Sequence, residues 1–136
     1  MMNAYSWPVR VYYEDTDAAG VVYYANYLKF MERARTEWLR ALGFEQTALN
    51  HEHHAVFVVR ALTIEFLRPA LFNDMLEVTV ELTGARGSLI ELAQAVRRGR
   101  DTLVTSKVKI ACVNTRSLKP VRIPKPVIEK LAARQR

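Results

Sequence analysis

The chain has 136 residues, of which 50% are hydrophobic and 25% are charged, so it is long enough to bury a core without a disulfide or metal. Its one cysteine, Cys112, excludes an intrachain disulfide and a cysteine-rich zinc site, and it suits a reducing compartment. The net charge of +6 is scattered and carries no RNA-recognition signature, so we expect a solvated surface or a phosphate-bearing ligand and no nucleic acid.

The first residues do not resemble a targeting segment. They lack an apolar core flanked by positive charge, and no run in the chain approaches the roughly 18 apolar residues of a membrane-spanning helix. We therefore expect one domain, residues 1–136, located in the cytoplasm without membrane insertion.

The first half of the chain changes from strand to helix. Residues 5–14 alternate apolar and polar side chains, which predicts a β-strand, and an acidic loop follows over residues 15–22. From about Tyr23 the period becomes helical, and Gly43 stands where a helix often ends. A shorter helix is predicted over residues 45–50. The apolar face of the long helix would carry Tyr27, Phe30, Met31, Ala34, Trp38 and Leu42.

The second half of the chain has strand character. It is rich in Val, Ile, Phe and Thr, and glycine-containing turns interrupt it, one of them from Gly84 to Gly87. The predicted strands are residues 55–70, 75–83, 88–99 and 102–115, followed by a proline-broken tail and a terminal helix. The long helix can bury its aromatic face only on the concave side of this sheet. The sequence therefore predicts an α+β fold in which a curved antiparallel sheet wraps around one long central helix, the hot-dog arrangement.

Three acids, Glu14, Asp15 and Asp17, stand just before the long helix. The first turn of a helix has N–H groups without intrahelical partners, and the helix dipole adds positive charge there. Such amides can polarise an acyl carbonyl while a carboxylate activates water or attacks the carbon. Helix capping and turn formation are the structural alternatives. A metal is not expected, because a hard cation needs about six oxygens.

The acidic loop and the helix after it resemble a known signature. The segment VRVYYEDTDAAGVVYYANYLKFMERARTEWLR, with its pattern Y-x-x-D-T-D-x-x-G-x-x-Y, resembles hot-dog acyl-CoA thioesterases of the 4-hydroxybenzoyl-CoA type, and most closely their Tol–Pal-associated branch. The segments AVFVVRALTIEFLRPALFNDMLEV and LKPVRIPK extend the resemblance over nearly the whole chain. The resemblance implies hydrolysis of an acyl-CoA or acyl-carrier-protein thioester, with no cofactor beyond the coenzyme A of the substrate. The alternative is a non-catalytic acyl-CoA or acyl-carrier binder, which an intact D-x-D motif disfavours.

The resemblance also implies roles for particular residues. The catalytic carboxylate falls on Asp17, as nucleophile or general base, and the backbone N–H of Tyr24 would polarise the thioester carbonyl. The Tol–Pal branch commonly has His in place of Tyr24, and the backbone role does not depend on that side chain. Arg86 corresponds to a basic turn that contacts the nucleotide of coenzyme A, with Arg60 and Ser88 as weaker candidates.

Hot-dog domains pair through their sheet edges, which hides unpaired strand edges. The resemblance implies a homodimer, assembled further into a tetramer, in which Asp17 of one chain faces Val58 or Val59 of the other. The histidine-rich run at residues 51–54 is expected on an exposed loop and is not predicted to bind a metal.

Overall fold

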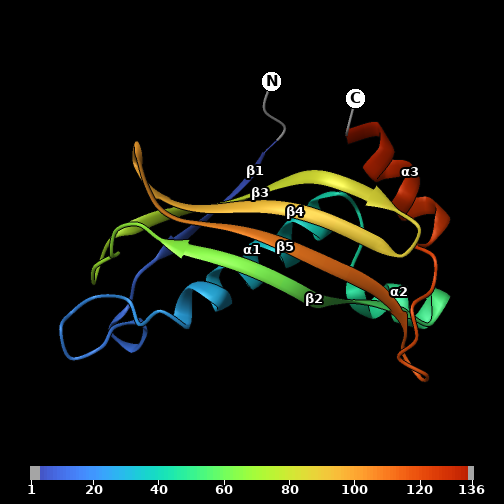
Figure 1. Cartoon of the computed structure of the whole chain (residues 1–136), viewed down its shortest axis with the longest axis horizontal. Helices are drawn as coiled ribbons and strands as arrows, with labels where there is room; N and C mark the ends of the chain where they lie inside the picture. The colour runs from blue at the N-terminus through green and yellow to red at the C-terminus, as the bar shows by residue number, and fades with distance from the viewer. Residues whose placement is uncertain (1–3, 135–136) are drawn as a thin grey trace.

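The computed structural model describes residues 4–134, and its elements form one curved sheet with helices beside it (Figure 1). The elements in chain order are β1 (Tyr5–Arg10), the 3-10 turn η1 (Tyr13–Asp15), α1 (Asn26–Ala41), α2 (Gln46–His53), β2 (Ala55–Phe66), β3 (Met75–Arg86), β4 (Leu89–Arg98), β5 (Asp101–Asn114) and α3 (Lys125–Arg134). The five-stranded sheet has the order β1-β3-β4-β5-β2, and every neighbouring pair is antiparallel. This architecture confirms the predicted hot-dog fold. None of the helices in residues 4–134 is both long and apolar enough to cross a bilayer.

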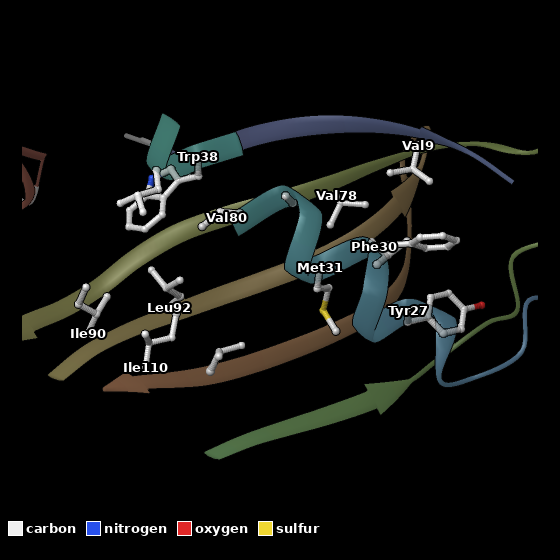
Figure 2. Packing of buried hydrophobic residues seen from close by; sticks show 14 of the residues in the cluster. Val9, Tyr27, Phe30, Met31, Trp38, Val78, Val80, Ile90, Leu92 and Ile110 are labelled. Atoms are coloured by element: carbon white, nitrogen blue, oxygen red, sulfur yellow. The ribbon is translucent and has the colours of Figure 1, made fainter. Parts of the chain in front are cut away.

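The core lies between α1 and the concave face of the sheet (Figure 2). The predicted apolar face of α1 is buried, with Phe30 and Ala34 at 0% exposure. It packs against strand residues such as Val78, Val80 and Leu92, which are also buried. Burying a side chain of this size contributes about 1.5–3 kcal/mol, so the helix is held to the sheet mainly by this face.

The C-terminal end of α1 is closed by its own backbone. Gly43 has a positive φ of 100°, and its N–H donates to the carbonyl of Arg40 at 2.9 Å. The N–H of Phe44 donates to the carbonyl of Leu39 at 3.1 Å, which completes a Schellman motif. The predicted helix end at Gly43 is therefore confirmed, because only glycine adopts this backbone conformation without strain.

Several predicted boundaries were wrong. The first strand ends at Arg10, because the chain beyond it enters η1, and α1 begins at Asn26 instead of Tyr23. Gly84 lies at a shift in the β3–β4 register and is not part of the turn, which consists of Gly87 and Ser88. Arg86 is accordingly the last residue of β3.

Strand β2 forms an edge of the sheet. It pairs with β5 alone, and residues 67–74 carry the chain from its end to β3, which pairs with β1 near the other edge. Large apolar side chains of β2 are exposed, including Val58 at 41%, Val59 at 43% and Phe66 at 49%. An apolar open edge of this kind is a surface for pairing with another strand.

Candidate active site

Asp15 ties the acidic loop to the start of α1. It is 7% exposed, and its Oδ2 accepts a hydrogen bond from the Tyr12 N–H at 2.9 Å. Its Oδ1 accepts from the side-chain amide of Asn26 at 2.8 Å, and its carbonyl accepts from the Tyr23 N–H at 2.9 Å. Both carboxylate oxygens therefore hold the loop, as expected for a buried carboxylate that forms no ion pair in the described part of the chain, residues 4–134.

Asp17 stands at the exposed tip of this loop. Residues 16–22 fold back on themselves, with the Asp17 N–H donating to the Val21 carbonyl at 2.9 Å. The loop is also held from outside, because the Val22 N–H donates to the Ala70 carbonyl at 2.9 Å. Oδ1 of Asp17 accepts from the Ala19 N–H at 2.8 Å. The predicted turn-forming role of an acid in this loop is thus seen at Asp17, and this leaves Oδ2 for other partners.

The N-terminal end of α1 has no side-chain cap. Its N-cap is Ala25, so none of the loop acids caps α1, although Asp15 accepts from the N-cap N–H of the short turn η1. The N–H groups of Asn26 and Leu28 donate to the carbonyls of Tyr23 and Ala25 at 2.8 and 3.1 Å. Within residues 4–134, the N–H groups of Tyr24 and Ala25 have no acceptor. Tyr24 thus precedes the helix instead of lying inside it, and its amide is available to a ligand.

Aromatic side chains surround this open helix start. Tyr24 is 62% exposed and meets Phe66 edge to face, with ring centroids 6.3 Å apart. A side-chain hydrogen bond with Tyr24 is the main cause that raises the pKa of Tyr23 above its usual value. Burial raises the pKa of Tyr27, whose hydroxyl accepts from the Ala70 N–H at 3.0 Å. A surface hollow of about 250 Å³ lies here, lined by Val22, Tyr24, Tyr27, Phe66, Leu67, Arg68 and Pro69.

The predicted substrate-binding residues lie away from this loop in a single chain. Val58 and Val59 line a cavity between α1 and β2, and Arg60 follows them on the exposed edge strand. Arg86 and the half-buried Ser88 lie at the far end of β3 from Met75, which pairs with Arg10 near the acidic loop. A strand rises about 3.3 Å per residue, so the ends of β3 are roughly 35 Å apart. One chain alone does not bring Arg86 to Asp17.

The histidine-rich run falls on α2 and not on a loop, with His51 and His53 in its last turn. No group of three potential metal ligands occurs in the part of the chain that the structure describes. Asn26, the first residue of α1, reaches Asp15 across the loop through its side-chain amide. No local signal in the sequence indicates this contact, because the two residues are joined by a loop whose path depends on Ala70.

The fold and the carboxylate loop before an uncapped helix are those of a thioesterase-type hot-dog protein. Residues 11–131 match the Thioesterase-like superfamily, and the chain belongs to that family. The acyl-CoA thioesterase YbgC of Haemophilus influenzae is 48% identical over 125 residues, 92% of each chain. The acyl-CoA thioester hydrolase YbgC of Escherichia coli O6:H1 is 47% identical over 125 residues, covering 91% of this chain and 92% of that protein.

Solved structures agree with this membership. A probable thioesterase from Bartonella henselae is 40% identical, with a TM-score of 0.85, and the match covers 89% of this chain and 99% of that one. The family predicted from the D-T-D segment is therefore confirmed. The association with the Tol–Pal system stays a prediction.

Proposed function

We propose that this protein is an acyl-CoA thioesterase, a single-domain cytoplasmic enzyme in which Asp17 and the Tyr24 backbone amide act on the thioester. The observation that carries the proposal is the pair of amides, at Tyr24 and Ala25, that have no acceptor within residues 4–134. They stand beside a loop that Asp15 fastens to the helix and whose tip holds an exposed carboxylate. The names of the relatives, acyl-CoA thioesterase and acyl-CoA thioester hydrolase, support the substrate class.

The proposed chemistry needs only this chain's groups and water. The Tyr24 N–H donates to the thioester carbonyl oxygen and stabilises the negative charge that develops there, a contribution of about 10²–10³ in rate for one donor. The Asp17 carboxylate either takes a proton from the attacking water or attacks the acyl carbon itself and forms an anhydride that water then opens. In both routes the C–S bond breaks, the sulfur leaves as the thiolate of coenzyme A, and the acyl group leaves as a carboxylate.

We propose that the working unit is a homodimer paired through β2. The exposed apolar edge of β2 supports this assembly. The loop of residues 15–22 and the β3–β4 hairpin lie at opposite ends of the sheet (Figure 1). An antiparallel pairing of two β2 edges would therefore bring the Asp17 end of one chain to the Val58, Val59 and Arg86 end of the other. Each site would then use residues of both chains, and a tetramer of such dimers stays a prediction.

The first experiment is a thiol-release assay of the wild-type protein with short, long and aromatic acyl-CoAs and with an acyl-carrier-protein thioester. We expect release of free thiol from at least one acyl-CoA. Binding of acyl-CoA without release would identify a non-catalytic binder of the same fold.

A second experiment tests the shared site by co-expressing an Asp17→Asn chain with an Arg86→Ala chain, assayed at acyl-CoA concentrations where each variant alone is weak. Half of a random mixture is mixed dimers with one intact site each, so we expect about a quarter of the wild-type activity. No recovery in a verified mixed dimer would contradict the shared site.

Arg86 is proposed to contact the phosphates of coenzyme A, with Arg60 and Ser88 nearby in the pair. Arg86→Ala is expected to raise KM and to flatten its dependence on salt, because the lost contact is between charges. Arg100, an exposed arginine in the β4–β5 turn, provides the matched control. If Arg86→Ala and Arg100→Ala leave KM equally unchanged, Arg86 does not bind the nucleotide.

A further inference from the structure

The cavity between α1 and β2 is lined by an arginine, Arg35, that forms no ion pair within residues 4–134. The cavity has a volume of about 320 Å³, and most of its wall is apolar. The lining residues are Trp38, Leu39, Phe57, Val58, Val59, Ile90 and Ile110, together with the polar Glu32, Arg35, Thr36 and Gln46. Its volume is near the lower end of the ~300–1,000 Å³ range of small-molecule sites, which suits a short acyl group.

Arg35 is half-buried in the wall of this cavity. Its one hydrogen bond within residues 4–134 is donated to Oε1 of Gln94 at 2.9 Å, and no carboxylate lies within ion-pair distance of it there. Glu32 helps to keep the guanidinium charged from a distance, but burial outweighs it and lowers the pKa of Arg35. An arginine has five N–H donors, so most of those on Arg35 have no protein acceptor.

The remaining donors of Arg35 border open space. No side-chain nitrogen or oxygen that is fully buried lacks a partner in residues 4–134, so the guanidinium nitrogens without an acceptor are accessible to solvent, and Arg35 is one of the residues that line the cavity. The other polar groups of the wall are already engaged. Gln46 exchanges hydrogen bonds with the backbone of Phe57, at 2.9 and 3.3 Å, and Thr36 donates to Glu32 at 3.5 Å.

The cavity adjoins the place where the acyl carbon is proposed to lie. Val58 and Val59 line it, and in the proposed dimer these residues face Asp17 of the second chain. An acyl group whose carbonyl is held at that carboxylate would extend past the two valines toward Arg35. This step depends on the proposed thioesterase function and its shared site.

We infer that Arg35 is a specificity-determining residue, which binds an oxygen acceptor on the acyl group of the substrate some bonds away from the thioester. A half-buried guanidinium with unused donors gains most from an oxygen acceptor, above all from a carboxylate. A plain alkyl chain in the same cavity would leave those donors unpaired, which costs binding of the substrate and of its transition state.

The test compares adipoyl-CoA with hexanoyl-CoA, whose acyl groups have equal carbon counts and end in a carboxylate or a methyl group. We expect the wild type to favour adipoyl-CoA in kcat/KM by about tenfold to hundredfold, the usual value of a buried hydrogen bond to a charged group. We expect Arg35→Met to abolish this preference, and 6-hydroxyhexanoyl-CoA to fall between the other two in the wild type.

Gln94→Met is the matched control. Gln94 is 3% exposed and also donates to the Met31 carbonyl at 3.1 Å, so either variant breaks the same bridge between α1 and β4. If Arg35 only braces the helix, both variants lower the two activities alike and leave their ratio unchanged. We expect Gln94→Met to keep the preference for adipoyl-CoA, because the guanidinium remains.

The wild type alone can overturn the inference, whether or not the variants fold. A wild-type preference for hexanoyl-CoA, or an equal rate with both substrates, would contradict the assigned role of Arg35. Absence of hydrolysis of every acyl-CoA would instead contradict the proposed function itself, so the two failures are distinguishable.

Discussion

The two ends of α1 are built differently. At the C-terminal end, Gly43 and Phe44 donate their N–H groups back to the last turn, and the backbone closes the helix by itself. At the N-terminal end, no side chain caps the helix, and the N–H groups of Tyr24 and Ala25 have no acceptor within residues 4–134. Unpaired helix donors are normally satisfied by a cap, by water or by a ligand.

We propose that the C-terminal end of α1 is purely structural and that the N-terminal end binds the substrate. Two acids lie beside the open end of the helix. The carboxylate of Asp15 accepts hydrogen bonds from the Tyr12 N–H and the Asn26 side chain, and that of Asp17 accepts from the Ala19 N–H. These hydrogen bonds hold the loop in place and leave the N–H groups of Tyr24 and Ala25 without an acceptor in residues 4–134. A fixed loop, a free carboxylate oxygen and unpaired amides are the parts that acyl transfer needs.

The largest expected effect comes from Asp17→Asn. We expect kcat/KM for acyl-CoA to fall by about 10²–10⁴-fold, the usual contribution of a general base. Stability should change by less than about 0.5 kcal/mol, because Asp17 is exposed and Asn keeps an oxygen for the Ala19 N–H. Glu14→Gln, at another exposed acid next to the loop, is the control and should keep its activity. Near wild-type turnover by Asp17→Asn would remove Asp17 from the mechanism.

Cys112 contrasts with Asp17 in exposure: its thiol is potentially reactive but buried, whereas the Asp17 carboxylate is exposed. It is 0% exposed, and burial raises its pKa from 9.0 to about 11. The thiolate fraction below pH 9 is then about a hundredfold lower than in the unfolded chain, so a thiol reagent should react at least that much more slowly with native protein. Stopped-flow labelling at pH 8 with and without urea measures the ratio. Equal rates would show that Cys112 is open to solvent.

Asp15→Ala tests whether stability and activity depend on the hydrogen bonds by which Asp15 holds the loop. The change leaves the Tyr12 N–H and the Asn26 amide without their acceptor, which should cost about 1–3 kcal/mol of unfolding free energy. Activity should fall as well, because the Asp17 carboxylate is then no longer held at a fixed position relative to the Tyr24 N–H. Urea denaturation and kcat/KM measure the two effects. An active enzyme with a loosened loop would contradict the positioning role of Asp15.

Gly43→Ala perturbs the closed end of α1. A side chain at a φ of 100° is strained, although no atom lies within 4 Å of the added Cβ, so we expect a loss of about 1–2 kcal/mol. Activity below the melting temperature should stay at the wild-type value, since Gly43 does not line the cavity between α1 and β2 and lies at the opposite end of α1 from Tyr24. A large loss of kcat with the fold intact would mean that the two ends are coupled.

Local patterns predicted the parts of the fold that depend on local periodicity. The buried face of α1 and the alternation of β3 follow from side-chain spacing, and the stop at Gly43 follows from its backbone freedom. The start of α1 could not be predicted in this way. Tyr23 has helical spacing, but its N–H is taken by the carbonyl of Asp15, and that contact depends on the folded loop.

For the candidate site, the sequence predicted the type of catalytic group but not the contacts that position it. The D-T-D segment makes Asp17 the candidate carboxylate, whereas the hydrogen bond between Asp15 and Asn26 comes from tertiary structure. Strand β2 pairs with β5, which is distant in the sequence. The spacing of Val58 and Val59 therefore could not predict that they are exposed on an edge strand. In the sequence, Arg35 is one of several charged residues on the helix, and only its contact with Gln94 and its place in the cavity wall distinguish it.

The most direct measurement is a single-turnover experiment, with enzyme in excess over an acyl-CoA that the thiol-release assay shows to be hydrolysed. Both products are quantified by mass spectrometry. The wild type should convert all of the bound acyl-CoA to carboxylate and free coenzyme A, whereas Asp17→Asn should bind it and return it intact. Equal conversion by the two proteins, or binding without conversion by the wild type, would contradict hydrolysis by a carboxylate at the open end of α1.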